Sequence, residues 1–227
     1  MPDIAAPRNT VIIFDLDGTL VDSAPDLSGA MNHVLEAEGH DAIPAQDVRH
    51  LVGHGAKALL EAGLARHGIT ASEEEMAALI ERFIAHYKVH LTDSTVPFRH
   101  VGKTLEHLAE GGFPLAVCTN KREELALPLL EDLKLTSFFD CIICRDSLPS
   151  YKPDPLPLLT CAERTGASRG VMVGDTMTDL TAAIAADMPC LIASFGYGTF
   201  TETEIKKARQ FDDFDEIPGI ISEIFSD

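Results

Sequence analysis

The chain has 227 residues, 45% of them hydrophobic, and a formal net charge of −18 from 36 Asp and Glu against 18 Lys and Arg. This composition supports a packed core, excludes a wholly disordered chain, and disfavours nucleic acid and anionic membranes as partners. No apolar run reaches membrane-spanning length and no secretory signal is present, so we expect a cytoplasmic location.

The first element is a short apolar run, Val11–Phe14, mostly β-branched or aromatic, which predicts a buried strand. It ends in Asp15 and Asp17, followed by Gly18. Because side chains alternate along a strand, the two carboxylates would project the same way from its carboxyl end. Asp and Gly also end strands simply as turn formers, so this stretch alone leaves a site and a turn equally open.

The stretch 22–96 has helical patterns throughout and predicts a small all-helical domain inserted after the first strand. Its expected helices run from Pro25 to before Gly39, from Ala45 to Leu51, from Ala56 to His67, and onward from a capping box of Ser72 and Glu75. The predicted domains are therefore 22–96 and, as one body, 1–21 with 97–227.

From Val101 onward, helices alternate with short apolar strands. The expected strands are Leu115–Cys118, Cys141–Cys144, Val171–Val173 and Cys190–Ala193, and the expected helices are Val101–Ala109, Arg122–Leu133, Pro155–Thr165, Asp179–Ala186 and Pro218–Phe225. Pro128 lies inside one of these helices and predicts a kink or break, at a cost of about 3 kcal/mol. The alternation indicates βαβ units, and so an α/β fold with a parallel sheet covered on both faces.

The five cysteines are odd in number and scattered, which disfavours a disulfide framework. Cys141 and Cys144 have C-x-x-C spacing but lie in an apolar, strand-like run with no second pair at zinc spacing. We expect them to be buried strand residues rather than a redox or metal site.

Polar residues follow four of the strands. They are Asp15 and Asp17, Thr119 and Asn120, Lys152, and Asp175 with Asp179. The carboxyl ends of parallel strands share one edge of the sheet, so these side chains should converge in one crevice. Packed carboxylates raise one another's pKa values unless a cation holds them ionised, and Mg²⁺ favours such oxygen ligands. A lysine and a hydroxyl beside them suit phosphoryl transfer, in which a carboxylate can be the nucleophile.

These motifs resemble those of the haloacid dehalogenase superfamily phosphatases, and within them the phosphoglycolate phosphatase group. The family's D-x-D-G-T-L-x-D-S motif stands at Asp15–Ser23, its strand ending in Thr or Ser at Val117–Asn120, its lysine at Lys152, and its G-D-x-x-x-D motif at Gly174–Asp179. All four come in the family's order, and the resemblance covers essentially the whole chain. It implies a Rossmann-like parallel-sheet core with a helical cap inserted after the first motif.

The resemblance also implies a role for each motif residue. Asp15 would attack phosphorus, and Asp17 would protonate the leaving oxygen and then activate water. Thr119, the Asn120 backbone and Lys152 would hold the phosphoryl group. The implied reaction is hydrolysis of a small phosphorylated metabolite, most specifically 2-phosphoglycolate, through an aspartyl-phosphate.

The implied cofactor is Mg²⁺. Its ligands would be the Asp15 carboxylate, the Asp17 backbone carbonyl and Asp175, with Asp179 supporting them. One departure concerns the helix after this motif, which ends in glycine in relatives but here reaches Asp187. Asp tolerates the left-handed conformation less well than Gly, so we expect a local cost in stability.

The cap segment around Val52 resembles a V-G-x-G segment of phosphoglycolate phosphatase caps. Its candidate substrate-binding residues are Arg49, Gly53, His54, Gly55 and Lys57. Backbone amides around the glycines, with the flanking charges, could meet a small carboxylate. A plain turn between two helices, with solvated charges on either side, explains the same residues equally well.

Three alternatives to this function stay open. One is a phosphatase for another small metabolite, such as a sugar phosphate or a nucleotide, and another is a sugar-phosphate mutase. Thr19 after the motif glycine favours a hydrolase. The third is a regulatory binding module on the same fold, which the presence of Asp15, Asp17, Lys152 and Asp175 disfavours.

Overall fold

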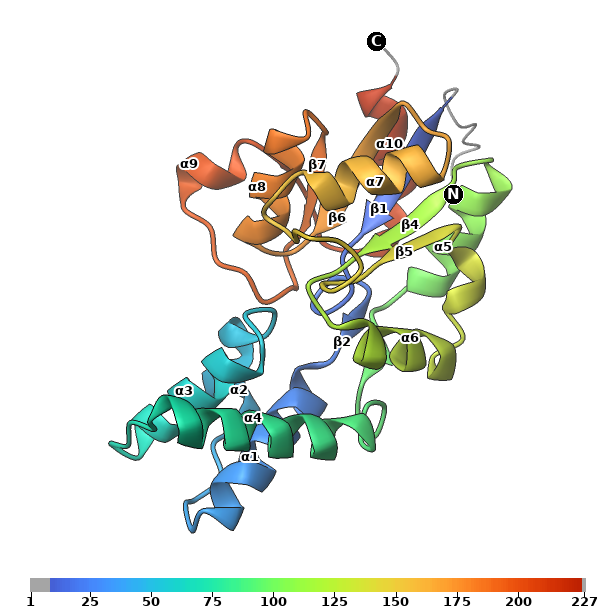
Figure 1. Cartoon of the computed structure of the whole chain (residues 1–227). Coiled ribbons are helices and arrows are strands. Elements are labelled where there is room, and N and C mark those ends of the chain that lie inside the picture. Colours follow the sequence, from blue (N-terminus) through green and yellow to red (C-terminus); the bar gives the residue numbers. More distant parts are fainter. Residues whose placement is uncertain (1–8, 226–227) are drawn as a thin grey trace. The chain divides into compact units, whose positions relative to one another are not determined.

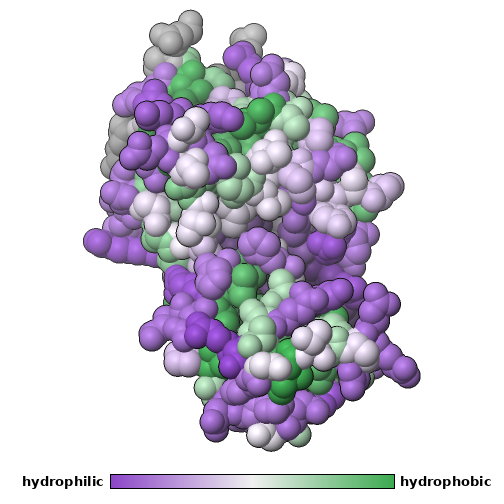
Figure 2. Space-filling view, turned by 90° about the vertical axis from the view of Figure 1, so that its left-hand side faces the viewer, coloured by the Kyte–Doolittle hydropathy of each residue, from purple (hydrophilic) through white to green (hydrophobic). Residues whose placement is uncertain are grey.

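The computed structural model describes residues 9–225, which form two compact units (Figure 1). One takes the chain up to Val21 and again from Pro97, and the other spans Asp22–Val96. Two short strands, Val21–Asp22 (β2) and Val96–Pro97 (β3), pair at the two crossing points. Among the described residues, every helix is too short or too polar to cross a membrane. Hydrophilic side chains predominate on the face shown in Figure 2, as the net charge leads one to expect.

The first unit is built on a six-stranded sheet in the order β5-β4-β1-β6-β7-β8, with every neighbouring pair parallel. Its strands are β1 (Thr10–Phe14), β4 (Leu115–Cys118), β5 (Cys141–Ile143), β6 (Arg169–Gly174), β7 (Cys190–Ala193) and β8 (Arg209–Phe211). Phe14 at the end of β1 lies opposite Val117 on one side and Val173 on the other. The predicted parallel α/β fold is confirmed.

Helices α7 (Leu156–Arg164) and α8 (Met177–Ala185) cover one face of this sheet (Figure 1). The core on this face includes Val11 and Ile13 of β1 packed with Cys161 of α7. All five cysteines are buried and none is in a disulfide. Cys141 lies in β5 as expected, whereas the strand ends one residue before Cys144.

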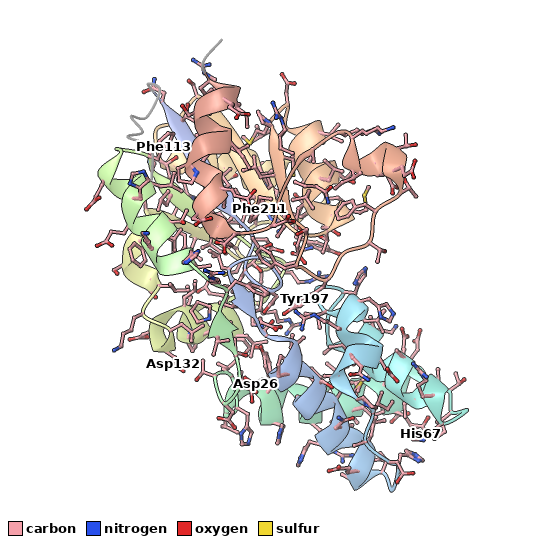
Figure 3. The ribbon with its side chains drawn as sticks, turned by 180° about the vertical axis from the view of Figure 1, so that it is seen from behind. Asp26, His67, Phe113, Asp132, Tyr197 and Phe211 are labelled. Carbon is pink, nitrogen blue, oxygen red and sulfur yellow. The ribbon has the colours of Figure 1, made fainter. Side chains whose placement is uncertain are left out.

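Helices α5 (Val101–Glu110) and α10 (Ile217–Ile224) lie on the opposite face of the sheet. This face is toward the viewer in Figure 3, where the molecule is turned by 180° from Figure 1. Phe14 of β1 contacts two aromatic rings there, stacking on Phe214 and meeting Phe139 edge-on, each at 6.3 Å between ring centroids. The central strand is therefore buried on both faces, as its unbroken apolar sequence predicts.

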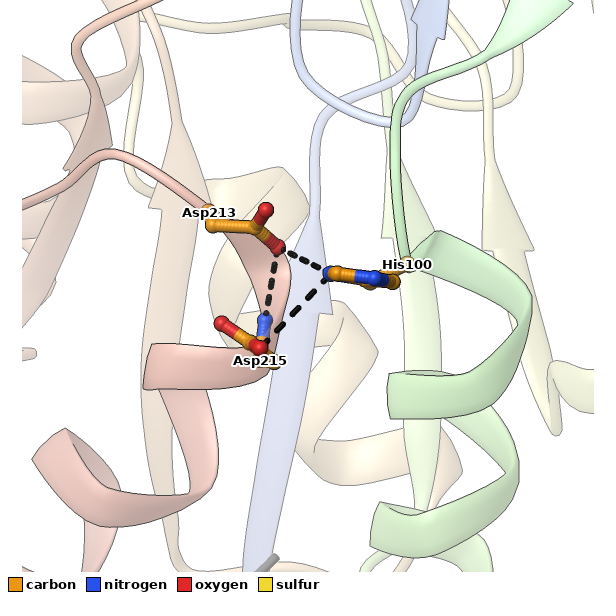
Figure 4. Close-up of side chains that lie close together, drawn as sticks. All are labelled: His100, Asp213 and Asp215. Carbon is orange, nitrogen blue, oxygen red and sulfur yellow. Dashed lines mark hydrogen bonds and ion pairs between the residues drawn. The ribbon is translucent and has the colours of Figure 1, made fainter.

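A polar contact fixes the start of α5. His100 precedes the helix in the left-handed conformation, with its Nδ1 2.7 Å from Asp213 Oδ1 and 3.7 Å from Asp215 Oδ2 (Figure 4). Asp213 also accepts a hydrogen bond from the Asp215 N–H and caps the short 3₁₀ helix η3 (Phe214–Glu216). The contact thus ties the beginning of α5 to the segment that leads into α10.

Helix α6 (Glu123–Asp132) continues through Pro128, so the predicted break is wrong. Proline removes one backbone hydrogen bond and crowds the preceding turn, but the helix buries a full apolar face. The buried residues are Leu125, Ala126, Leu129 and Leu130. Tertiary packing of that face outweighs the local cost.

Six short elements were not expected from the sequence. They are the strands β2, β3 and β8, the 3₁₀ helices η2 (Thr136–Phe138) and η3, and helix α9 (Glu202–Ile205). Asp187, two residues beyond the end of α8, has the left-handed conformation with φ 55°. Asp187 thus adopts the left-handed conformation that glycine usually provides after a helix.

The second unit consists of helices. They are α1 (Ala24–Ala37), α2 (Ala45–Val48), the 3₁₀ helix η1 (Arg49–Leu51), α3 (Ala56–Arg66) and α4 (Glu73–Lys88). The expected helix 45–51 is therefore divided between α2 and η1, and the capping box of Ser72 and Glu75 is present. Asp26 of α1, labelled in Figure 3, accepts hydrogen bonds from the N–H groups of Ser94 and Thr95 and joins the end of this unit to its first helix.

Candidate functional site

Side chains that follow four strands of the sheet meet at its carboxyl edge. Asp15 follows β1, Thr119 follows β4, Lys152 lies in the loop after β5, and Asp175 follows β6. Strand β1 lies between β4 and β6, at the point where the connections change from one face of the sheet to the other. Ligands of open α/β sheets bind at such a point, so the fold concentrates these groups where a ligand is expected.

Three carboxylates and one lysine form the centre of the site. Single carboxylate oxygens of Asp15, Asp175 and Asp179 all lie within 4.8 Å of one another. Lys152 Nζ is 2.6 Å from Asp179 Oδ1 and 3.0 Å from Asp15 Oδ1. The side chains of Lys152 and Asp179 are 1% and 0% exposed and that of Asp15 is 13% exposed, so Asp15 is the member of these pairs that solvent reaches.

Burial and mutual repulsion govern the protonation of this cluster. Burial raises the pKa of Asp15 to about 7, with Lys152 opposing the rise and Asp179 adding to it. Burial also raises the pKa of Asp175 well above its ordinary value, and the charges of Asp179 and Asp15 raise it further. Burial by itself would lower the pKa of Lys152, but Asp15 and Asp179 outweigh it and raise that pKa. One ammonium does not compensate three carboxylates, and a divalent cation would hold them ionised.

Asp175 is fixed from two sides. Its Oδ1 accepts a 2.9 Å hydrogen bond from the Thr19 hydroxyl, and its Oδ2 accepts a 2.8 Å bond from the backbone N–H of Tyr197, labelled in Figure 3. A Cβ on Gly18 would lie 2.3 Å from Asp175 Oδ2, and one on Gly196 would lie 2.2 Å from Asp175 Cβ. Any larger residue at either glycine would displace this carboxylate.

The donor set fits a hard divalent cation such as Mg²⁺. Both oxygens of Asp179 are engaged, Oδ1 by Lys152 and Oδ2 by the hydroxyl of Thr176 at 2.7 Å and by the N–H groups of Thr176 and Asp175. Asp15 Oδ1 is buried and, among the described residues, has no hydrogen-bond partner of good geometry. Within residues 9–225, Asp175 accepts a single hydrogen bond at each oxygen, whereas Asp179 accepts one from an ammonium at Oδ1 and three at Oδ2. Asp15 and Asp175 therefore keep more lone pairs for an ion, with Asp179 orienting their surroundings.

The residues after β4 join the Lys152 loop to the site. The Asn120 side-chain amide donates a 2.8 Å hydrogen bond to the Lys152 carbonyl. Thr119 is buried, and its hydroxyl accepts from the N–H of Lys121 at 3.1 Å. These contacts fix the loop that carries Lys152 relative to the end of β4.

Lys121 is a residue of the site that sequence reasoning missed. Its Nζ lies 3.0 and 3.1 Å from the two carboxylate oxygens of Asp17, with side-chain exposures of 5% and 11%. The available signal was a lysine two positions beyond Thr119, directly after the motif at the end of β4. Asp17 thus faces a second ammonium instead of Lys152.

The candidate cap residues all lie in the helical unit. Arg49 forms a 3.1 Å ion pair with Asp22, and Lys57 lies 3.7 Å from Glu61 one helical turn away. Gly53 and Gly55 have positive φ angles of 94° and 90°, and His54 between them is exposed. A substrate-binding role for this segment stays a prediction.

Comparisons with known proteins identify the family to which the chain is similar. The family model described as haloacid dehalogenase-like hydrolase matches residues 12–193. A phosphoglycolate phosphatase of Agrobacterium fabrum is 38% identical over 223 residues, 97% of this chain and 96% of its own, and one of Caulobacter vibrioides is 43% identical over 84% of this chain and 81% of its own. A crystal structure of a predicted phosphoglycolate phosphatase from Haemophilus somnus matches with a TM-score of 0.85 at 29% identity, covering 93% of this chain and 97% of that one.

Proposed function

The chain belongs to the haloacid dehalogenase-like hydrolases, and we propose that it is a Mg²⁺-dependent phosphatase that hydrolyses 2-phosphoglycolate to glycolate and phosphate. The observation that carries the proposal is the surroundings of Asp15. This carboxylate stands at the end of the central strand, with its Oδ1 3.0 Å from Lys152 Nζ, and it lies beside two further carboxylates. The substrate is suggested by the names of the relatives from Agrobacterium fabrum and Caulobacter vibrioides.

In the first step, an Asp15 oxygen attacks phosphorus and forms an aspartyl-phosphate, while the bond from phosphorus to the bridging oxygen breaks. Asp17 gives its proton to that oxygen, and glycolate leaves. In the second step, Asp17 takes a proton from water, and the resulting hydroxide attacks the aspartyl-phosphate. Phosphate is released, and Asp15 returns to its starting state.

The remaining residues of the site position and neutralise the phosphoryl group. Lys152 supplies a fixed positive charge, and Thr119 with the Asn120 backbone supplies hydrogen-bond donors. Mg²⁺ would be held by the carboxylates of Asp15 and Asp175 and the backbone carbonyl of Asp17, and it would offset the negative charge of carboxylates and phosphate.

Phosphate release from a panel of phosphomonoesters tests this proposal. The panel holds 2-phosphoglycolate, sugar phosphates and nucleotides, each assayed with Mg²⁺ and again with a chelator. We expect the highest kcat/KM for 2-phosphoglycolate, loss of activity with chelator, and recovery when Mg²⁺ is restored. If only 2-phosphoglycolate is hydrolysed at the background rate, the proposed substrate is refuted. If every compound of the panel is hydrolysed at the background rate, the proposed phosphatase activity is refuted. Interconversion of sugar phosphates without phosphate release would indicate a mutase.

A further inference from the structure

The site contains two buried ammonium groups with different partners. Lys152 lies between Asp15 and Asp179, among the groups assigned to the phosphoryl end of the substrate. Lys121 contacts both oxygens of Asp17 instead, at 3.0 and 3.1 Å. The second positive charge is therefore on the side of the site where the leaving group must lie.

The reaction itself fixes how far Lys121 is from that leaving group. To protonate the bridging oxygen, Asp17 must come within hydrogen-bond distance of it. Since Lys121 Nζ is within hydrogen-bond distance of the same carboxylate, the ammonium and the bridging oxygen are at most two hydrogen-bond lengths apart. In 2-phosphoglycolate a single methylene separates the bridging oxygen from the carboxylate carbon, so the carboxylate is only two covalent bonds further away and can turn toward Lys121 Nζ.

We infer that Lys121 is a specificity-determining residue that binds the carboxylate of 2-phospho-carboxylate substrates, an inference that rests on the proposed function. The substrate class is a phosphomonoester with an anionic group one carbon from its bridging oxygen. Such a substrate brings a further negative charge into a site that already holds four carboxylates, and Lys121 offsets it where it arrives. Because the Lys121 side chain is only 5% exposed, the contact forms with little competing water.

The backbone of Lys121 is held in place before any substrate binds. Its N–H donates to the Thr119 hydroxyl at 3.1 Å, and its carbonyl accepts from the Arg145 N–H at 3.0 Å. A preorganised charge favours binding because little order is lost when the carboxylate arrives.

Two substrates of similar size test the inference: 2-phosphoglycolate and 2-hydroxyethyl phosphate, which carries a hydroxymethyl group in place of the carboxylate. The variants are Lys121→Met, which keeps the length of the side chain, Lys121→Arg, which keeps the charge, and Lys103→Met on the exposed face of α5 as a matched control. We expect Lys121→Met to lower kcat/KM for both substrates, since Asp17 loses its partner. The loss for 2-phosphoglycolate should be about tenfold larger, mainly through KM. Lys121→Arg should retain the preference.

An equal loss for both substrates in Lys121→Met would overturn the inference, because it would show that Lys121 only positions Asp17. Loss of the preference in Arg49→Met, with the preference kept in Lys121→Met, would overturn it as well and assign the carboxylate to the helical unit. If wild-type protein hydrolyses both substrates equally well, the inference fails and the phosphatase stands. If it hydrolyses neither, the proposed function itself fails.

A binding measurement keeps the test independent of turnover. Calorimetric titration with 3-phosphonopropionate and with propylphosphonate, in the presence of Mg²⁺, compares ligands with and without the carboxylate. Wild-type protein should bind 3-phosphonopropionate about tenfold more tightly, and Lys121→Met should bind the two alike. Equal wild-type affinities would contradict the inference even if Lys121→Met did not fold.

Discussion

Lys152 donates a 2.6 Å hydrogen bond to Asp179, and both side chains are buried. Lys152 lies in the loop after β5 and Asp179 in the first turn of α8 after β6, and these two strands are on opposite sides of β1 in the sheet order. The same ammonium lies 3.0 Å from Asp15 Oδ1, so the Lys152 side chain links buried Asp179 to the carboxylate at the centre of the site. We therefore expect stability and activity to depend on the same ammonium.

Replacing Lys152 with Met should reduce both the stability of the protein and its phosphatase activity. Removing one partner of a buried ion pair leaves an uncompensated charge, which costs about 3 kcal/mol or more in unfolding free energy. Urea denaturation measures this cost, with Lys103→Met as a surface control expected to stay within about 0.5 kcal/mol of wild type. Phosphate release should fall to background even at temperatures where Lys152→Met is folded. Unchanged stability would mean that Asp179 becomes protonated at little cost.

Asp15→Asn should abolish turnover and stabilise the metal-free protein. The amide has nearly the shape of the carboxylate but is a poor nucleophile, and it removes one negative charge from a crowded cluster. Burial already raises the pKa of Asp15 to about 7, which shows that the folded protein disfavours its charge. We expect the unfolding free energy to rise by about 1 kcal/mol at pH 8 in the presence of chelator. Turnover retained by Asp15→Asn would refute Asp15 as the nucleophile.

The main elements of the core could be predicted because its central strands are buried on both faces and therefore consist of runs of apolar residues. Once those strands were placed in a parallel sheet, topology alone brought Asp15, Lys152 and Asp175 to one edge. The family assignment drawn from the four motifs is confirmed by the family model over residues 12–193. The edge strand β8 was missed because, of its three residues, only Phe211 is buried.

Contacts between distant loops could not be predicted in the same way. The Thr19 hydroxyl reaches Asp175 across 156 positions of the chain, and Lys121 reaches Asp17 across 104. The backbone N–H of Tyr197 also serves Asp175, and a backbone group leaves no trace in residue identity. Pro128 is a case in which a local preference was outweighed: proline disfavours a helix interior, but the packing of the apolar face of α6 keeps the helix continuous.

Two glycines should respond oppositely to alanine. A Cβ at position 196 would lie 2.2 Å from Asp175 Cβ, whereas one at Gly102 in α5 meets nothing within 4 Å. Gly196→Ala should therefore cost about 2 kcal/mol or more by displacing a buried carboxylate, and it should weaken stabilisation by Mg²⁺. Gly102→Ala should be neutral or stabilise by up to about 1 kcal/mol through helix propensity. Melting curves with and without Mg²⁺ measure both effects, and a stable Gly196→Ala with a full Mg²⁺ response would contradict the close packing around Asp175.

The contact between His100 and Asp213 predicts a dependence of stability on pH away from the site. Burial raises the pKa of Asp213, but the His100 hydrogen bond, the Asp215 N–H and the charge of Arg99 outweigh it and bring the pKa below its ordinary 3.8. A carboxyl whose pKa is lowered by folding stabilises the protein above its unfolded pKa, and this contribution is lost as the pH falls through the folded value.

Asp213→Asn keeps a cap for the Asp215 N–H but removes the charge. At pH 7 it should lower the unfolding free energy by less than about 1 kcal/mol, because the pair is partly solvated. The difference from wild type should shrink as the pH is lowered below 3.8, while Glu106→Gln on the exposed side of α5 serves as control at each pH. Urea denaturation at pH 7, 5 and 3 measures the difference in unfolding free energy between Asp213→Asn and wild type. A difference that stays constant over this range would show that Asp213 acts through its cap and not through its charge.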